Sequence, residues 1–314
     1  MNTGDRKMEF TSRSYANTTD LQAMINLLYA TRPVIRLNDY PSEIDLREML
    51  ALERQQQHTR LWLTPDGLLA AFALVDAYNN LWFEMAASDG ELANQIIRWG
   101  GEDLCASVTE PDETLTLDTN CNSENIERIA ILKRHGFVEQ PVQTLHMIRS
   151  LDELMPEPQF PAGFSVRPIA DESEAEQITA LHQAAFGPDN FTLEERLAVM
   201  RTPDYDPALD MIAIAPTGEF AGYCTCQINA TENARTGQQI GTTDPVAVHP
   251  AYQGRRLARA LLLSGCHLLK ERGMTVAALG TSSENIAMQR AAESAGYRVQ
   301  LAKLWFAKVV AERS

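Results

Sequence analysis

The stretch that decides the fold is Asp244-Pro-Val-Ala-Val-His-Pro-Ala-Tyr-Gln-Gly-Arg-Arg-Leu-Ala-Arg-Ala-Leu-Leu262. Its apolar start, with the residues before it, predicts a β-strand over 240–248. A proline-containing turn follows, and a loop with Gly254 opens directly into an amphipathic helix predicted over 255–272. The start of a helix is thus expected directly after a strand and a short loop.

The loop before this helix has the chemistry of a phosphate-binding site. The first backbone N–H groups of a helix lack partners within the helix and lie at its positive end, so they favour an anion. Gly254 lets the backbone approach a ligand closely, and Arg255, Arg256 and Arg259 add positive charge. The alternative is an ordinary strand-to-helix connection in a globular domain.

The chain contains two copies of one unit. Ser123-Glu124-Asn125-Ile126 recurs 160 positions later as Ser283-Glu284-Asn285-Ile286, and the same offset relates Gly136-Phe137 to Gly296-Tyr297. A match that extends across a whole unit with its order preserved indicates a duplication.

The boundary between the copies is predicted where prolines gather. Residues 156–163 hold three prolines and a glycine. Proline restricts its neighbours to extended conformations and breaks helices. We therefore predict a domain over 1–155, a linker over 156–163 and a domain over 164–314. A usual domain size of roughly 150 residues agrees with two domains in this chain.

Each copy is predicted to be an α/β domain (α+β mixed sheet), a central mixed β-sheet flanked by helices. In the second copy the expected order is β-α-α-β-β-β-α-β-α-β, and the first copy follows the same order with weaker signals. The polar residues 230–239 are expected to form an extra loop. Thr192 and Glu195 have capping-box spacing at the start of one helix. The segments expected in the second copy are 164–168, 171–186, 192–200, 209–215, 220–228, 240–248, 255–272, 276–279, 283–295 and, as one or two strands, 298–310.

Composition and charge exclude several classes of protein. Hydrophobic residues make up 45% and charged residues 22%, which is ordinary for a globular protein. The net charge of −15 disfavours nucleic-acid binding, which needs a basic surface. No apolar run is long enough for a membrane span and residues 1–10 have no apolar signal core, so a cytoplasmic location is expected. The five cysteines form no Cys-x-x-Cys pair, and Cys224 and Cys226 alternate on one face of an expected strand, so we expect core packing and no metal site.

At the loop and its flanking elements, the second copy resembles the GNAT superfamily of acyl-CoA-dependent N-acetyltransferases. The family pattern is a strand ending Val-x-Val, then His-Pro, then Gln/Arg-x-x-Gly-x-Gly/Ala, and later an Asn helix that leads to Gly-aromatic. The matching residues are Val246, Ala247, Val248, His249, Pro250, Gln253, Gly254, Ala258, Asn285, Gly296 and Tyr297. The sequence departs from the pattern at Arg256, where glycine is not required if the backbone is right-handed helical.

The resemblance implies acetyl-CoA as co-substrate and no metal. Backbone groups of Val246–Val248 would pair with the pantetheine arm, which lies beside the strand like an added strand. Backbone N–H groups of the loop would hold the pyrophosphate, with Gln253 at its start. Asn285 would contact the pantetheine or cap its helix. The residues implied in cofactor binding are Val246, Ala247, Val248, Gln253, Gly254, Arg255, Arg256, Leu257, Ala258, Arg259 and Asn285.

The first copy lacks this loop. Its matching strand, 81–87, leads into Ser88-Asp89-Gly90-Glu91, which places two carboxylates where phosphates would lie. Because like charges repel, we predict that the first domain is degenerate and does not bind CoA. It is expected to pack against the second domain and to shape the acceptor pocket.

The reaction implied is direct attack of a primary amine on the thioester in a ternary complex. The first candidate for the base is Asp244, four residues before Val248, and its alternative is a turn residue before Pro245. Glu84 and Glu232 are weaker candidates, and a water relay to any of them is an option. The backbone N–H of Val248 is the expected donor to the developing oxyanion.

The family's usual acid is missing. A tyrosine is typical at the eighth position of the Asn helix, where this chain has Ala292, and Leu132 in the first copy. A thiol that resembles cysteine has a pKa near 8.5 and is already a tolerable leaving group. Tyr223, Ser282 or a water are the substitutes considered.

These inferences predict an N-acetyltransferase that acts on a small-molecule amine. The missing tyrosine motivates a first alternative, a non-enzymatic acyl-CoA binder or sensor. The degenerate first copy motivates a second, an interaction module that keeps the fold without the ligand.

Overall fold

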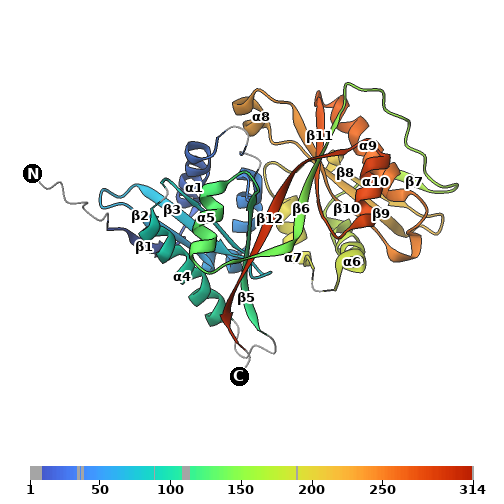
Figure 1. The fold of residues 1–314 in the computed structure, drawn as a ribbon. Helices are drawn as coiled ribbons and strands as arrows, with labels where there is room; N and C mark the ends of the chain where they lie inside the picture. The colour runs from blue at the N-terminus through green and yellow to red at the C-terminus, as the bar shows by residue number, and fades with distance from the viewer. Residues whose placement is uncertain are drawn as a thin grey trace, which may run out of the picture. The chain divides into compact units, whose positions relative to one another are not determined.

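The computed structural model describes residues 9–33, 36, 39–87, 89–107, 114–188 and 190–312. The chain divides into two compact units, one of Met1–Pro141 with Leu304–Ser314 and one of Val142–Lys303. Figure 1 labels most of the helices and strands. Helices pack on both sheets and one of the sheets is mixed, which confirms the predicted α/β fold class.

The N-terminal unit is built on an antiparallel sheet. Its elements are β1 (Thr11–Ser14), α1 (Thr18–Thr31), α2 (Glu43–Leu50), α3 (Glu53–Gln57), β2 (Thr59–Leu63), β3 (Leu69–Val75), β4 (Leu81–Met85), α4 (Gly90–Ser107), β5 (Leu115–Asn122) and α5 (Ile126–Arg134). The sheet has the order β1-β2-β3-β4. One buried cluster joins Met24 of α1 to Phe72 of β3, and another joins Trp62 of β2 to Ile96 of α4.

The C-terminal unit is built on a mixed sheet. Its elements are β6 (Val138–Ser150), β7 (Ser165–Pro168), α6 (Ala175–Phe186), α7 (Leu193–Met200), β8 (Asp210–Ile214), β9 (Phe220–Gln227), α8 (Ala230–Thr236), β10 (Ile240–Val248), α9 (Leu257–Glu271), β11 (Val276–Ser282), α10 (Ile286–Ser294) and β12 (Arg298–Ala311). In this unit β6, β11, β10, β9, β8 and β7 are consecutive neighbours in the sheet, and β10 and β11 are parallel. Leu261 and Cys266 of α9 pack on one face with Cys224, and Ile178 of α6 packs on Tyr223 in a separate cluster.

The last strand of each copy contributes to the other unit. Strand β6 ends the first copy, yet it pairs antiparallel with β11, from Ser150 opposite Val276 to Thr144 opposite Ser282. Strand β12 ends the second copy, and its residues from Leu304 onward belong to the N-terminal unit. The compact units therefore differ from the repeated segments. The predicted linker over 156–163 concerns the segments and stays a prediction.

Local signals account for most helix ends. The side chain of Thr192 accepts a hydrogen bond from the Glu195 N–H, and the carboxylate of Glu195 accepts one from the Thr192 N–H, which confirms the capping box. Gly273 follows α9 with φ +82°, a conformation that glycine adopts without strain.

Several predicted elements differ from the structure. The predicted loop 230–239 contains the helix α8, which the Asn229 side chain caps by accepting from the Glu232 N–H. This helix is short and polar and has no apolar periodicity. The helix expected from residue 171 begins at Ala175, after a 3₁₀ turn over Glu172–Glu174. The C-terminal residues, expected as one or two strands, form a single strand, β12. Within the described residues, no helix is long and apolar enough to cross a membrane.

Candidate acyl-CoA site

The central feature of the C-terminal unit is the separation of two parallel strands. Within the described residues, β10 and β11 pair only at Ile240–Val276, Gly241–Ala277 and Thr242–Ala278. Beyond Thr242 the two strands diverge, although β10 continues to Val248. One edge of β10 therefore has backbone groups without a neighbouring strand.

The pairing on the opposite side shows which backbone groups face the open edge. The N–H of His249 donates to the carbonyl of Ala221, 2.9 Å away, so His249 and, by alternation, Ala247 face β9. The N–H and C=O groups of Val246 and Val248 then point to the edge that faces β11. The carbonyl of Val248 accepts a hydrogen bond from the Gln253 side chain at 3.2 Å. This edge can accept an extended ligand in the manner of an added strand.

The loop after β10 presents the start of α9. The residue before the helix, Arg256, makes no side-chain capping bond, and the Ala260 N–H is the first to bond back to the Arg256 carbonyl. The N–H groups of Leu257, Ala258 and Arg259 thus have no acceptor within the helix. Gly254 is exposed with φ +74°. This arrangement suits an anion at the helix start.

The backbone of Arg256 does not have the right-handed helical conformation in which glycine would not be required at this position. Its backbone is left-handed, with φ 65° and ψ 18°, and not right-handed helical. This conformation costs a residue with a Cβ about 1–2 kcal/mol. Glycine, which the family pattern has at this position, would adopt it without that cost. The arginine is therefore a strained substitution in the centre of the loop.

A cavity of about 980 Å³ joins the open edge and the loop. The residues that line it are Ala185, Phe186, Val246, Ala247, Val248, Gln253, Gly254, Arg256, Leu257, Ala258, Arg259, Asn285, Ala287, Met288, Arg290, Ala291 and Ser294. Nearly all of the residues implied in cofactor binding are among them, and Arg255 is the exception. The sequence did not single out Arg290, Met288 or the α6 residues Ala185 and Phe186, because only the fold brings α6 and α10 to this loop.

Asp244 lies where β10 and β11 begin to diverge. Its side chain is exposed, and Oδ2 accepts a hydrogen bond of 3.0 Å from the N–H of Gly280 on β11. The carboxylate therefore spans the two strands at the start of the open edge, four residues before Val248. It is not one of the residues that line the cavity.

Tyr223 and His182 form a buried pair beside the cavity. The Tyr223 hydroxyl lies 2.5 Å from Nδ1 of His182, and Nε2 of His182 lies 3.0 Å from the Asn190 side-chain oxygen. Burial raises the pKa of Tyr223 above its usual range and lowers the pKa of His182, so both groups are held neutral. His182 also contacts the ring of Phe186, which lines the cavity. The Tyr223 hydroxyl is therefore engaged with His182.

The other residues singled out have clear placements. Asn285 caps α10 by accepting from the Met288 N–H at 3.0 Å, and it also lines the cavity. Ala292 is fully buried in the core beneath α10. Ser282 accepts from the Glu284 N–H, and Glu232 accepts from the Asn229 side chain. Cys224 and Cys226 face the same core with their sulfurs 4.0 Å apart.

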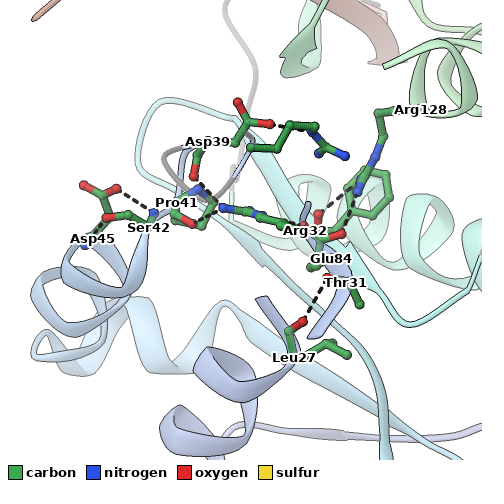
Figure 2. A network of polar contacts seen from close by, with 11 residues as sticks. Leu27, Thr31, Arg32, Asp39, Pro41, Ser42, Asp45, Glu84 and Arg128 are labelled. Carbon is green, nitrogen blue, oxygen red and sulfur yellow. Dashed lines mark hydrogen bonds and ion pairs between the residues drawn. The ribbon is translucent and has the colours of Figure 1, made fainter. Parts of the chain in front are cut away.

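The matching strands of the N-terminal unit enclose a cluster of charged side chains (Figure 2). Arg128 of α5 donates to the carbonyl of Phe83 at 3.1 Å and lies over the Phe83 ring. Glu84 is buried between Arg32, at 2.7 Å, and Arg128, at 3.5 Å. Burial raises the pKa of Glu84, but the positive charges of Arg128 and Arg32 outweigh it and hold the pKa below its usual range. At the offset of 160, Glu84 corresponds to Asp244 and Arg128 to Met288.

This cluster leaves little space for a ligand. The cavity that it lines has a volume of about 30 Å³, against about 980 Å³ in the C-terminal unit. At the start of α4, the Asp89 carboxylate accepts from the N–H groups of Glu91 and Leu92 at 2.8 and 2.9 Å. A side chain of the unit itself therefore occupies the position where an anion would bind. Ser88 lies outside the described residues.

Comparisons with known proteins agree with the geometry of the C-terminal unit. Residues 175–297 match the family model described as acetyltransferase (GNAT) family. A mycothiol acetyltransferase from a Nocardioides species is 28% identical over 263 residues, which cover 79% of this chain and 84% of that protein. A second, from Thermobispora bispora, is 31% identical over 48% of this chain and 52% of its own length. For three further mycothiol acetyltransferases the alignment spans 48%, 48% and 54% of their length.

Solved structures share the fold over nearly the whole chain. A GCN5-related N-acetyltransferase from Sphaerobacter thermophilus has a TM-score of 0.68 and 23% identity, with 96% of each chain covered. A tandem GNAT protein from the clavulanic acid biosynthesis pathway has a TM-score of 0.65 and 14% identity, and the match covers 98% of this chain and 100% of that one. At these identities the likeness concerns the fold.

Proposed function

We propose, from the premise that residues 175–297 are an acetyltransferase domain of the GNAT family, that this chain transfers an acetyl group from acetyl-CoA to a primary amine of a small molecule. The acceptor attacks directly while both substrates are bound. The observation that carries the proposal is the open edge of β10, continuous with the unpaired helix start of α9 and with a cavity of about 980 Å³. The relatives named mycothiol acetyltransferase support an acetyl donor and a small acceptor.

The binding step uses backbone groups. The amides of the pantetheine arm pair with the C=O group of Val246 and with the N–H and C=O groups of Val248 at the open edge. The diphosphate accepts hydrogen bonds from the N–H groups of Leu257, Ala258 and Arg259. Gln253, which bonds to the Val248 carbonyl in this structure, lies at the start of the loop between the two parts of the ligand.

The transfer step forms a C–N bond and breaks a C–S bond. The amine nitrogen attacks the thioester carbonyl carbon, and the N–H of Val246, which lies nearer to Asp244 than the expected donor Val248, donates to the oxyanion that develops. The proton that the amine loses passes to the Asp244 carboxylate, directly or through a water. The thiolate of CoA then leaves and takes a proton from solvent, because a thiol with a pKa near 8.5 needs little assistance. This route requires no tyrosine at the position of Ala292.

Each chain holds one working site under this proposal. In the N-terminal unit, Arg128 and Glu84 fill the space between the matching strands, and Asp89 satisfies the start of α4. Because Glu84 is buried and paired with Arg128, these two side chains would have to be displaced before CoA could bind. The N-terminal unit thus acts as a structural partner and not as a second enzyme.

The test is release of free thiol from acetyl-CoA in the presence of a panel of amines. Acceptor-dependent thiol release supports the transferase. The replacement of the usual tyrosine by Ala292 favours one second candidate, a non-enzymatic acyl-CoA binder. That candidate predicts a higher melting temperature with acetyl-CoA but no thiol release with any amine. If acetyl-CoA leaves the melting temperature unchanged at millimolar concentration, both candidates fail and a fold-only interaction module is left.

A further inference from the structure

The cavity wall carries a charge opposite to that of the whole chain. The chain has a net charge of −15, yet Arg256, Arg259 and Arg290 line the cavity and no aspartate or glutamate is among its described lining residues. In the part of the chain that the structure describes, these three arginines form no ion pair with a carboxylate. The wall is therefore suited to a ligand with several negative charges.

The side chains of two of these arginines belong to the part of the cavity wall that α10 forms. Arg256 is adjacent to the helix start, whereas Arg259 lies about 4.5 Å farther along the axis of α9, at 1.5 Å per residue. Arg290 is on α10, the helix that forms another part of the cavity wall. The diphosphate is assigned to backbone N–H groups, that of Arg259 included, so the side chains of Arg259 and Arg290 are a second cationic group that it does not account for.

A hydrogen bond holds the side chain of Arg259, one of these two arginines, in place. Nε of Arg259 donates to the carbonyl of Ser294 at 3.0 Å, at the C-terminal end of α10. This bond fixes the guanidinium between the two helices and leaves its terminal nitrogens for another acceptor. Arg290 is exposed on the same helix, one turn before Ser294.

Coenzyme A carries a third phosphate on the 3′-oxygen of its ribose, separate from the diphosphate. We propose that Arg290 and Arg259 bind this 3′-phosphate, so that the protein discriminates CoA from 3′-dephospho-CoA. A phosphate monoester carries about −1.5 to −2 charges near pH 7, and two guanidinium groups match its oxygens. The inference rests on the proposed function, since it assigns a further part of the same ligand.

The experiment compares binding of CoA and 3′-dephospho-CoA to the full chain by calorimetry. Loss of one hydrogen bond to a charged group at an exposed site weakens binding about tenfold. Wild type should therefore have a dissociation constant for 3′-dephospho-CoA that is at least about tenfold higher than that for CoA. Arg290→Gln should weaken CoA binding and reduce the ratio of the two dissociation constants to about twofold or less. Arg259→Gln should reduce the ratio in the same direction.

A matched control is Arg298→Gln, because Arg298 is an exposed arginine of β12 that does not line the cavity. This variant should keep the wild-type ratio, and all variants should keep the wild-type melting temperature without ligand within a few degrees. Equal affinity of wild type for the two ligands, or an unchanged ratio in Arg290→Gln, would overturn the assignment while leaving the proposed function intact. Failure of both ligands to bind would overturn the proposed function together with this inference.

Discussion

The strained residue in the loop gives a prediction about both stability and site geometry. Replacement of Arg256 by glycine removes the left-handed strain, which is about 1–2 kcal/mol for a residue with a Cβ. Glycine also adds freedom to the unfolded chain, which costs about 0.5–1 kcal/mol. The free energy of unfolding should therefore rise by roughly 0.5–1 kcal/mol in Arg256→Gly, equivalent to about 1–4 °C in melting temperature for a unit of this size.

Arg255→Gly is the matched control for this substitution. Arg255 is the preceding residue in the same loop, it is also exposed, and its φ is not positive. It loses the same charge and gains the same chain freedom without any relief of strain, so its stability should fall by about 0.5–1 kcal/mol. Thermal and urea unfolding of the two variants without ligand measure the difference. If both variants are destabilised equally, the left-handed conformation of Arg256 and the loop geometry derived from it are refuted.

Further predictions concern the reaction and the N-terminal unit. Asp244→Asn keeps an oxygen that can accept from Gly280 but cannot take a proton, so kcat for thiol release should fall about 100-fold with KM for acetyl-CoA little changed; a wild-type kcat would remove Asp244 as the base. Calorimetric titration with acetyl-CoA should give one site per chain because Arg128 fills the N-terminal space, and a stoichiometry of two would contradict this. Glu84→Gln removes one partner of a buried ion cluster and should lower stability by about 3–5 kcal/mol at pH 7. Because the folded-state pKa of Glu84 is lowered, ionised Glu84 stabilises the fold above its unfolded-state pKa near 4.5, and this stabilisation is lost as pH falls from there through the folded-state pKa. The free energy of unfolding of Glu84→Gln should therefore fall less steeply with acid than that of wild type. Parallel curves of unfolding free energy against pH would contradict an ionised Glu84.

Local sequence patterns predicted those strands and helices whose type and ends depend on residues close together in the chain. The strand 240–248 was predicted with its correct bounds, since the apolar run Val246–Val248 and the proline-containing turn after it mark its end. The capping box at Thr192 was likewise readable from spacing alone. The helix after the loop was expected from 255, and it begins at Leu257 because Gly254 and Arg256 have positive φ values that apolar periodicity does not report.

Features that depend on distant contacts were not readable in the same way. The contribution of β6 to the sheet of the C-terminal unit joins residues more than a hundred positions apart, and no periodicity specifies such a partner. Arg128 carries no sequence signal of its role, because its effect depends on a buried Glu84 that only the fold places beside it. Arg290 was missed for the same reason, since it lines the cavity from a different helix.

The most direct measurement is the structure of the full chain in complex with acetyl-CoA. The account predicts the pantetheine arm beside Val246 and Val248 and the diphosphate at the N–H groups of Leu257–Arg259, with the N-terminal unit empty. A complex in which the open edge of β10 stays unoccupied, or in which the ligand lies between β4 and β5, would contradict it.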